Sequence, residues 1–469
     1  MYKTTVGIEV HAEVKTKTKI FSNSLNNYGK MANTTTNVVD LGYPGTLPTL
    51  NKEVLYLATR AALVLNCTIN KRMHFDRKNY FYPDNPKNYQ ITQNRTPIGI
   101  NGYVEIETEN GPKKIRIHDI HIEEDTSKSI HDKDKSLLDF NRAGVPLVEI
   151  VTEADMENDK EAVLYLEKLR ELLLYADVSD CKIEEGSMRC DCNVSVSKTE
   201  KLGTKIEIKN IGSISNVGLA IKYEENRQKE LIENGETLKE ETRRYDDKEN
   251  KTVHMRYKEK GNDYRYFPEP DIPFVELTDE YIENVKNNLP ITAEERRKKY
   301  IESGINKVNV EKIIQNRPLS DYINKFIDKK INLVIASNLL LGDIASYLNK
   351  METKIENTKL TDEKFIEVVN LLDSGKINSK IFKNILEDIM EKEDEIDKIL
   401  KDHNVEEIDL SSLEKIIDNV LKSNVQSVTD YKNGNERAVK YLMGQIMKET
   451  KGNANPMLIT EILTKKLNS

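Results

Sequence analysis

The chain has 469 residues, of which 38% are hydrophobic and 32% charged, and its formal net charge at pH 7 is −8. This length exceeds one typical hydrophobic core, so we expect two or three domains, and the composition excludes an intrinsically disordered protein. The acidic charge argues weakly against nucleic acid as a partner, because a phosphate-binding protein usually carries a basic surface.

The chain lacks the marks of membrane insertion, export and disulfide cross-linking. No apolar run reaches the roughly 18 residues that a membrane helix needs. The N-terminal stretch MYKTTVGIEVHAEV alternates like a strand and leaves no room for a signal peptide. The four cysteines of the chain are too few and too irregularly spaced for a disulfide framework. We therefore expect reduced thiols, no membrane partner and a cytoplasmic location.

The first predicted strand, VGIEVHAEV (residues 6–14), has two distinct faces. Its aliphatic side chains alternate with Gly7, Glu9, His11 and Glu13, as in a half-buried strand. A carboxylate and an imidazole two residues apart on one strand point the same way, so Glu9 and His11 form a workable pair of metal ligands. The alternative is a solvated strand face, on which Glu and His are common.

A second acidic stretch, IHIEEDTSK (residues 120–128), ends another predicted strand. The isoleucines before and after His118-Asp119 are out of step in their alternation. A β-bulge at that point would reconcile them, and it leaves open whether Glu123 or Glu124 faces the polar side of the sheet.

Two long amphipathic helices interrupt the predicted strands. The first, at residues 159–176, has an apolar stripe with a period of 3.6 residues. The second is expected to begin with Ser215 as its N-cap and to end just before Gly235. Strands mixed with helices and long loops predict an α+β fold.

The stretch EEGSMRCDCNVSV (residues 184–196) raises the question of a zinc knuckle. Alternation places Cys190 and Cys192 on the apolar face, where free cysteine behaves as a small hydrophobic residue. A structural zinc site would need further ligands, and the chain has no second cysteine pair, so we expect no structural zinc. The opposite face carries Asp191 and Asn193, of which Asp191 is the candidate for chemistry.

A later strand, TKIEIKN (residues 204–210), again turns a carboxylate, Glu207, to its polar face. Several strands that each present a carboxylate suit a hard divalent cation such as Mg²⁺, which prefers oxygen ligands. Neither G-x-x-x-x-G-K-[ST] nor G-x-G-x-x-G occurs, so the phosphates of any ATP would be held by metal ions and side chains. The pattern favours metal-assisted phosphoryl transfer, in which positioning and charge neutralisation supply most of the catalysis.

From Thr292 onward nearly every segment has a helical pattern. Thr292 and Glu295 form a capping-box signature, and Thr361 is a candidate N-cap further on. The last stretch, at residues 435–467, has the pattern of two amphipathic helices joined by a polar turn. We therefore expect an α/β body followed by a helical region, which itself has two parts.

Several unusual blocks occur in order along the chain: VGIEVHAEV, LGYPGTLPTLN, FDRKNYFYPDNPKNYQITQ, IHIEEDTSKSIH, DFNRAGVPLVEIVTEAD, EEGSMRCDCNVSVS, MRYKEKGNDYRYFPEPDI and QIMKETKGNANP. Together they closely resemble the GatB/GatE family, whose members are subunits of the aspartyl/glutamyl-tRNA amidotransferases. The resemblance runs from Thr5 to the C-terminus, and blocks such as FDRKNYFYPDNPK are too long to match by chance.

The resemblance implies an α+β architecture in three parts. A mixed-sheet, cradle-shaped catalytic domain would occupy residues 1–291, an all-α helical domain residues 292–405, and a small helical tail domain (YqeY-like) that binds tRNA residues 406–469. An archaeal relative that acts on Glu-tRNA(Gln) alone carries an extra inserted domain, for which 469 residues leave no space.

The resemblance also implies a function within a heterotrimer. The GatB-type subunit uses ATP and Mg²⁺ to phosphorylate the side-chain carboxylate of Glu-tRNA(Gln) or Asp-tRNA(Asn). A glutaminase subunit of the amidase type releases ammonia from glutamine, and the ammonia reaches the GatB-type subunit through a channel and displaces the phosphate. The third subunit is a small belt around the other two. The acyl phosphate must be kept dry, which explains the channel. Two rival functions remain: a non-catalytic tRNA-binding scaffold, and a metal-dependent phosphotransferase that acts on a free metabolite.

The family's functional positions carry over to residues of this chain. The catalytic residues would be Glu9, His11, Glu124 and Asp191, and the metal ligands would be these four with Glu185 and Glu207. ATP would contact Arg189, Lys209 and Asn210. The substrate site and ammonia channel would be lined by Lys78, Tyr82, Lys87, Tyr89 and Arg142. The tRNA backbone would meet Lys448 and Lys451.

Some of these assignments have plain alternatives. Glu124 is preferred to Glu123 on the resemblance alone, and the choice between Glu184 and Glu185 stays open. The tyrosines also suit a loop-rich core. The arginines suit structural ion pairs, and a charge-rich helix is usually only solvated.

Overall fold

The computed structural model describes residues 2–257, 264–403, 405, 410–433, 435, 437–450, 454 and 456–468. The chain forms two compact units, the first ending at Ala293 and the second beginning at Glu294. The further division of the helical part near residue 405 stays a prediction. Among the described residues, no helix combines the length and the apolar character that a membrane crossing requires.

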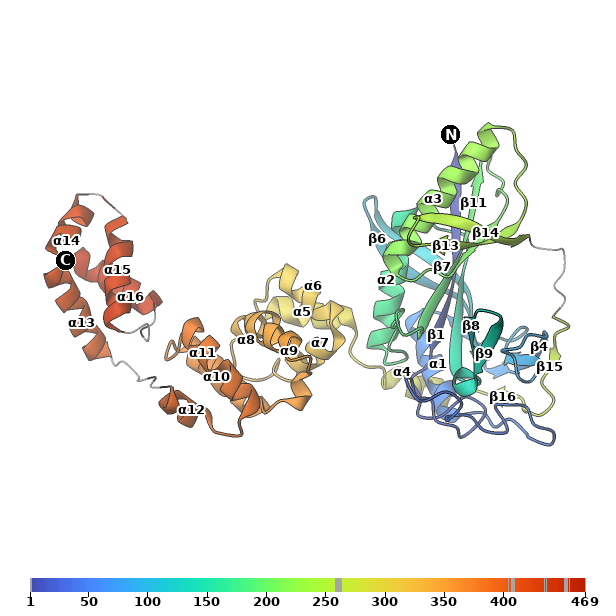
Figure 1. The fold of residues 1–469 in the computed structure, drawn as a ribbon, viewed down its shortest axis with the longest axis horizontal. Coiled ribbons are helices and arrows are strands. Elements are labelled where there is room, and N and C mark those ends of the chain that lie inside the picture. Colours follow the sequence, from blue (N-terminus) through green and yellow to red (C-terminus); the bar gives the residue numbers. More distant parts are fainter. Residues whose placement is uncertain are drawn as a thin grey trace. The chain divides into compact units, whose positions relative to one another are not determined.

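The first unit is built on a nine-stranded mixed sheet, coloured blue to green in Figure 1. Its strand order is β14-β13-β12-β11-β1-β10-β7-β6-β2, and every neighbouring pair is antiparallel except the parallel pair β12–β13. The predicted α+β class is confirmed. The strands are β1 (Lys3–Glu13), β2 (Thr68–Ile69), β6 (Gly99–Thr108), β7 (Gly111–Glu124), β10 (Pro146–Thr152), β11 (Met188–Ser197), β12 (Ile206–Lys209), β13 (Glu241–Asp246) and β14 (Lys251–Tyr257).

Helices cover one face of this sheet. They are α1 (Lys52–Val64), α2 (Asp159–Tyr175) and α3 (Ile214–Glu233), and Figure 1 shows α2 and α3 beside the strands. The stripe of α2 that includes Tyr165 and Leu169 is fully buried, in the same hydrophobic core as aliphatic residues of the strands such as Ile8. Because side chains alternate along a strand, burying this face turns the intervening polar side chains to the opposite face. That opposite face carries the candidate site.

Smaller elements complete the first unit. They are β3 (Arg72–Met73), β4 (Asp76–Asn79), β5 (Tyr89–Thr92), β8 (Lys128–Asp132), β9 (Lys135–Asp139), η1 (Phe140–Arg142), β15 (Phe267–Pro268), β16 (Val275–Glu276) and α4 (Asp279–Asn287). Strands β15, β4 and β5 form a small sheet, and β5 makes contacts with β7.

The β-bulge predicted near His118-Asp119 is confirmed. Along β10, Val151 is paired with Asp119, whereas the next residue, Thr152, is paired with Ile117. His118 is therefore the extra residue. The bulge shifts the alternation of β7 by one residue, which decides the direction of the glutamates at its end.

Of two helix N-caps predicted from the sequence, the structure confirms one and contradicts the other. The Thr361 hydroxyl accepts a hydrogen bond from the amide of Lys364, so the predicted N-cap is confirmed. The prediction of Ser215 as the N-cap of α3 is wrong, because the Ser213 hydroxyl accepts the bond from the amide of Asn216. Both serines have the side chain that a cap needs, and only the backbone path selects between them.

The second unit is helical. Its helices are α5 (Ala293–Glu302, which starts at the boundary), α6 (Lys307–Gln315), α7 (Arg317–Asn324), α8 (Leu333–Leu339), η2 (Leu340–Ile344), α9 (Ala345–Lys350), η3 (Ile355–Asn357), α10 (Asp362–Asp373), α11 (Ser379–Glu391), α12 (Ile396–Asp402), α13 (Leu410–Ser423), α14 (Val425–Lys432), α15 (Arg437–Glu449) and α16 (Pro456–Leu467). The rings of Tyr322, Phe326 and Phe365 pack together in its first part. Helices α13–α16 share a core of their own around Ile417, Leu442 and Ile459.

Candidate functional site

A first acidic group joins three neighbouring strands on the polar face of the sheet. Glu9 on β1, Asp191 on β11 and Glu207 on β12 place carboxylate oxygens within 4.8 Å of one another. The register explains the meeting, because Glu9 is directly opposite Asp191, and Asn193, two residues on, is directly opposite Glu207. We call these three carboxylates the first acidic group.

Neighbouring side chains hold the first acidic group in place. The Lys209 ammonium is ion-paired with Asp191 and lies 3.3 Å from Glu207. Burial lowers the pKa of Lys209, but the charges of both carboxylates together raise it to about 12. The Asn193 amide donates to Glu9 at 2.9 Å, and the Thr242 hydroxyl donates to Glu207 at 2.8 Å.

A second acidic group lies on the same face of the sheet, around His11, which is two residues after Glu9 on β1. His11 Nε2 is 3.4 Å from a carboxylate oxygen of Glu123 on β7 and 3.4 Å from one of Glu149 on β10. His121 hydrogen-bonds the other side of the group, at 2.9 Å from Glu149 and 2.8 Å from Asp119. We call His11, Glu123 and Glu149 the second acidic group.

The protonation of the second acidic group follows from this packing. Burial lowers the pKa of His11, but hydrogen bonds to Glu123 and Glu149 together with their charges raise it to about 10. The pKa of His121 is also raised to about 10 against the effect of burial, chiefly by the charge of Glu149. Burial acts to raise the pKa of Glu149, and the two imidazoles hold it well below its ordinary value.

Glu149 was not among the sequence-predicted site residues. It is the one carboxylate in the apolar run PLVEIV of β10, and its Cα is paired with that of His11. A lone acidic residue on the predicted polar face of a strand was the available signal, but the sequence does not show which strand lies beside β1.

Glu124 belongs to neither acidic group. It is ion-paired with Lys87, and it accepts a hydrogen bond from the amide of Ile91 at 2.8 Å. Burial raises the pKa of Glu124, and the charge of Lys87 opposes the shift. Glu124 and Lys87 line a small, partly enclosed cavity together with Tyr89 and Asp125. The bulge of β7 thus sends Glu123 to the acidic face and Glu124 to this cavity.

Arg142 and Arg189 surround Asp125 beside that cavity. Arg189 donates to Asp125 at 2.6 Å, and Arg142 lies 3.5 Å from the same carboxylate. Arg142 also donates to the carbonyls of Thr126 and Ser127. Both guanidinium groups therefore make structural contacts at the edge of the polar face.

The remaining predicted site residues of the first unit, Lys78, Tyr82 and Asn210, have different environments. The Lys78 ammonium is 5.1 Å from the centre of the Tyr264 ring, and its pKa is raised against burial by the charges of Glu123 and neighbouring groups. Tyr82 is 65% exposed. Asn210 directly follows β12 with a positive φ of 59°.

Glu185 lies outside both acidic groups. It is exposed in the turn before β11, where it is ion-paired with Lys182 at 2.8 Å. The structure thus brings Glu9, Asp191, Glu207 and Lys209 together and leaves Glu185 apart.

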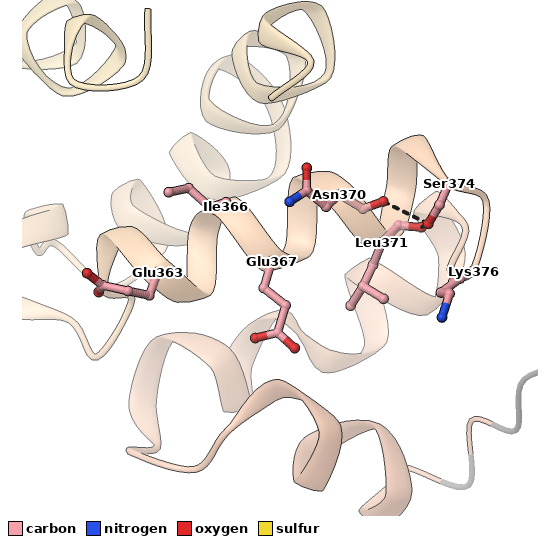
Figure 2. A pocket seen from close by; sticks show the side chains of 7 residues that line it. All are labelled: Glu363, Ile366, Glu367, Asn370, Leu371, Ser374 and Lys376. Carbon is pink, nitrogen blue, oxygen red and sulfur yellow. Dashed lines mark hydrogen bonds between the residues drawn. The ribbon is translucent and has the colours of Figure 1, made fainter. Parts of the chain in front are cut away.

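Of the two predicted tRNA-contacting residues, the structure describes one, at the end of α15. Lys448 is exposed in the last turn of that helix, and Lys451 lies outside the described residues. The second unit also has an open groove, shown in Figure 2, lined by Glu363, Ile366, Glu367, Asn370, Leu371, Ser374 and Lys376. None of the predicted site residues that the structure describes lines this groove.

The cysteines lie on the face that alternation assigned to them. Cys190 is 4% exposed and Cys192 is fully buried, and both pack in the core beneath the helices. Asp191 between them faces the first acidic group. The thiols therefore contribute packing on one side of β11, while the acid contributes to the site on the other.

A mixed sheet with two acidic groups on one face, followed by a helical unit, defines an α+β catalytic domain with a helical extension. Residues 4–283 match the family model of the GatB/GatE catalytic domain, and residues 321–467 match that of the GatB domain. The chain belongs to the GatB/GatE family, so the resemblance noted in its motifs is confirmed.

Named relatives cover the whole chain. It is 46% identical to the B subunit of the aspartyl/glutamyl-tRNA(Asn/Gln) amidotransferase of Bacillus velezensis, over 99% of both chains. Identity to the proteins of the same name from Bacillus licheniformis and Geobacillus thermodenitrificans is 45% and 44%, over 100% of this chain and 99% of each relative.

Proposed function

We propose that this chain is the GatB subunit of a tRNA-dependent amidotransferase and that it activates the side-chain carboxylate of Glu-tRNA(Gln), Asp-tRNA(Asn) or both with ATP. The observation that carries the proposal is the pair of acidic groups on one sheet face, which meet at β1. The names of the full-length relatives support the substrate class. A role in translation and the bacterial origin of these relatives support a cytoplasmic location.

The reaction has two balanced steps. A side-chain carboxylate oxygen attacks the γ-phosphorus of ATP, ADP leaves, and an acyl phosphate forms. Ammonia then attacks the carbonyl carbon, phosphate leaves with the oxygen that it received, and a proton is released with the amide. The first step is needed because a carboxylate would otherwise have to expel oxide.

The two acidic groups fit divalent cations. The donors of the first acidic group are all oxygens, the kind of ligand that Mg²⁺ prefers, and with Lys209 these four side chains carry a formal charge of −2. The second acidic group adds one imidazole to two carboxylates. Bound Mg²⁺ would neutralise phosphate charge and orient the reacting oxygens. On this geometry Glu123 and Glu149 take the metal role with His11, in place of Glu124.

The basic residues around the groups have complementary roles in the proposal. Lys209 bridges Asp191 and Glu207 and would exchange those contacts for ATP phosphates. Arg189 on β11 and Asn210, which directly follows β12, would support the nucleotide. Lys78, beside Glu123, would hold the carboxylate substrate near the second acidic group.

The cavity beside Glu124 fits the last part of an ammonia path. Lys87, Glu124 and Tyr89 give it a polar lining, and Arg142 holds the neighbouring loop through the carbonyls of Thr126 and Ser127. A polar passage can keep ammonia hydrogen-bonded while it excludes bulk water. Tyr82, exposed on the same loop as Lys87, would face the aminoacyl end of the tRNA.

A partner protein would cover the exposed apolar residues between β1 and α1. They include Leu25, Tyr28, Met31, Tyr43 and Leu47, each at least 55% exposed. Exposed apolar clusters of this kind mark protein interfaces. We assign this segment to the glutaminase subunit, and the small belt subunit would complete the heterotrimer. Lys448 and Lys451 would contact the tRNA backbone.

Reconstitution tests the proposal. The chain alone should be inactive, and addition of the glutaminase and belt subunits, glutamine, ATP, Mg²⁺ and each mischarged tRNA in turn should yield Gln-tRNA(Gln) or Asn-tRNA(Asn). Asp191→Asn should abolish amidation and leave glutamine hydrolysis by the glutaminase subunit intact.

Glu185→Gln is the matched control, because this acid lies outside both acidic groups, and it should keep full activity. The absence of amidated product with every divalent cation would contradict the proposal. Full amidation by Asp191→Asn would instead favour the non-catalytic scaffold.

A further inference from the structure

Asn193 lies beside the first acidic group. It is on the polar face of β11, with Gly7 of β1 directly opposite on one side and Glu207 of β12 on the other. Its amide nitrogen donates to Glu9 Oε1 at 2.9 Å. The side chain is therefore in direct contact with one carboxylate of the group and adjacent to a second.

Chemistry decides the orientation of this amide. A carboxylate only accepts hydrogen bonds, so the NH₂ of Asn193 must face Glu9 and its oxygen must point elsewhere. That oxygen, Oδ1, is buried and has no hydrogen-bond partner in the described part of the chain. A buried acceptor is normally paired, so an unpaired one beside three carboxylates requires an explanation.

The nearby donors are engaged with the carboxylates. Lys209 is bonded to Asp191 and Glu207, and the Thr242 hydroxyl is bonded to Glu207. A Cβ built on Gly7 would make only ordinary van der Waals contacts, the nearest being with the Thr152 hydroxyl at 3.9 Å. Because Gly7 has no side chain, β1 places no side chain directly opposite Asn193.

We propose that Asn193 Oδ1 is a fourth oxygen ligand for the divalent cation held by Glu9, Asp191 and Glu207. Amide oxygens are ordinary ligands of hard divalent cations, and a neutral fourth oxygen adds coordination without adding charge. The same residue would orient Glu9 through its NH₂. The proposal rests on the proposed metal role of this acidic group.

Direct Mn²⁺ binding to the full chain tests this role without any measurement of catalysis. The parent protein for the experiment carries Glu149→Gln, which weakens the second acidic group and isolates the first. Free Mn²⁺ is measured by electron paramagnetic resonance in the absence of nucleotide and tRNA. Asn193→Ala should weaken Mn²⁺ binding about tenfold or more, because it removes a ligand.

Asn193→Asp separates ligation from positioning. Aspartate keeps an oxygen at the site and loses the donor to Glu9, so it should bind Mn²⁺ at least as tightly as the parent. If Asn193 only positions Glu9, the aspartate should repel that carboxylate and bind Mn²⁺ no better than Asn193→Ala. That result, or unchanged binding in both variants, would overturn the inference.

Two controls complete the experiment. Asn216→Ala removes another amide-to-carboxylate hydrogen bond, to Asp247 at 3.0 Å, and should leave Mn²⁺ binding unchanged. Thermal unfolding of the metal-free variants confirms that each is folded, and Asn193→Asp preserves the side-chain size if Asn193→Ala does not fold. If Asp191→Asn leaves Mn²⁺ binding of the parent unchanged, the proposed metal site itself is overturned. If Asp191→Asn weakens Mn²⁺ binding and Asn193→Ala does not, only the ligand role of Asn193 is overturned.

Discussion

At the scale of single residues, the protonation of His11 is set by the two carboxylates on either side of it. Its pKa of about 10 makes the ring an imidazolium at neutral pH, despite the burial that disfavours the charge. The proton on His11 thus supplies the positive charge between Glu123 and Glu149 that a bound metal ion would otherwise supply. An imidazole must lose this proton before its nitrogen can bind a metal.

Metal binding at the second acidic group should therefore release about one proton at pH 7.5. Its affinity should rise with pH up to about 10, the folded-state pKa of His11. Calorimetric titration with Mn²⁺ in two buffers of different ionisation enthalpy measures the proton release. Glu207→Gln, which affects only the first acidic group, is the control and should leave this release unchanged. Binding that is independent of pH between 6 and 9 would show that His11 does not lose its proton when the metal binds.

Glu13, two residues from His11 on β1, makes the stability of the fold depend on pH. Burial and then the charge of Asp125 raise its pKa to about 7, from an ordinary value of 4.5, although Arg189 and Arg142 oppose the shift. The folded state therefore holds this proton more tightly than the unfolded state does. Its stabilising effect is complete below pH 4.5 and is lost as the pH rises through 7.

Glu13→Gln should accordingly stabilise the protein more at high pH. With an allowance for partial exposure, we expect the gain in free energy of unfolding to be about 2 kcal/mol larger at pH 8 than at pH 5. Urea unfolding followed by circular dichroism at both pH values measures it, with exposed Glu185→Gln as the control. An equal gain at both pH values would show that Glu13 is not buried as an acid.

At the scale of elements, β6 passes very close to the turn between α1 and β2. A Cβ on Gly102 would lie 2.4 Å from the Cys67 sulfur and 2.5 Å from the Leu65 carbonyl oxygen. A glycine is required there by the close approach of two backbones. The contact fixes the edge of the sheet against α1.

Gly102→Ala should therefore cost about 2–3 kcal/mol of unfolding free energy through overpacking. Gly444→Ala is the contrasting variant, because Gly444 lies inside α15, and beyond its own helical backbone no atom of the described residues is within 4 Å of a built Cβ. It should stabilise the helix by up to about 1 kcal/mol. Urea unfolding measures both effects, and an unchanged midpoint for Gly102→Ala would refute the close approach.

Alternation of apolar and polar residues made several features of the strands predictable from the sequence. Period-two sorting correctly places Cys190 and Cys192 in the core and Asp191 on the polar face, and two isoleucine pairs out of step reveal the bulge of β7. These features depend only on residues near one another in sequence.

The approach of Glu149 to His11 depends instead on which distant strands become neighbours. More than 100 residues separate β1 from β10, and periodicity contains no information on that pairing. The directions of Glu123 and Glu124 are decided by where the bulge lies, which the sequence places only approximately. The assignment of individual acids therefore needed the structure, whereas the α+β class did not.

At the scale of the whole molecule, the two units have separate cores, and family models match residues on both sides of the boundary at Ala293. The acidic groups and the cavity beside Glu124 are built entirely from the first unit. Chemistry and recognition of the tRNA body would thus be divided between the units.

A chain that ends at Ala293 should keep its Mn²⁺ affinity and lose stable binding of tRNA. Spin-resonance titration and a filter-binding assay with mischarged tRNA measure the two properties, with the full chain as the reference. Loss of Mn²⁺ binding in a truncated chain with an intact circular-dichroism spectrum would show that the acidic groups need the helical unit.

Transfer of oxygen tests the central claim, activation of the carboxylate by ATP, most directly. Glu-tRNA(Gln) labelled with ¹⁸O in the side-chain carboxylate is converted by the reconstituted heterotrimer with ATP, Mg²⁺ and glutamine, and the released phosphate is examined by mass spectrometry. Activation by ATP should place one ¹⁸O in each phosphate, in an amount equal to the Gln-tRNA(Gln) formed. Formation of the amide with unlabelled phosphate would contradict it.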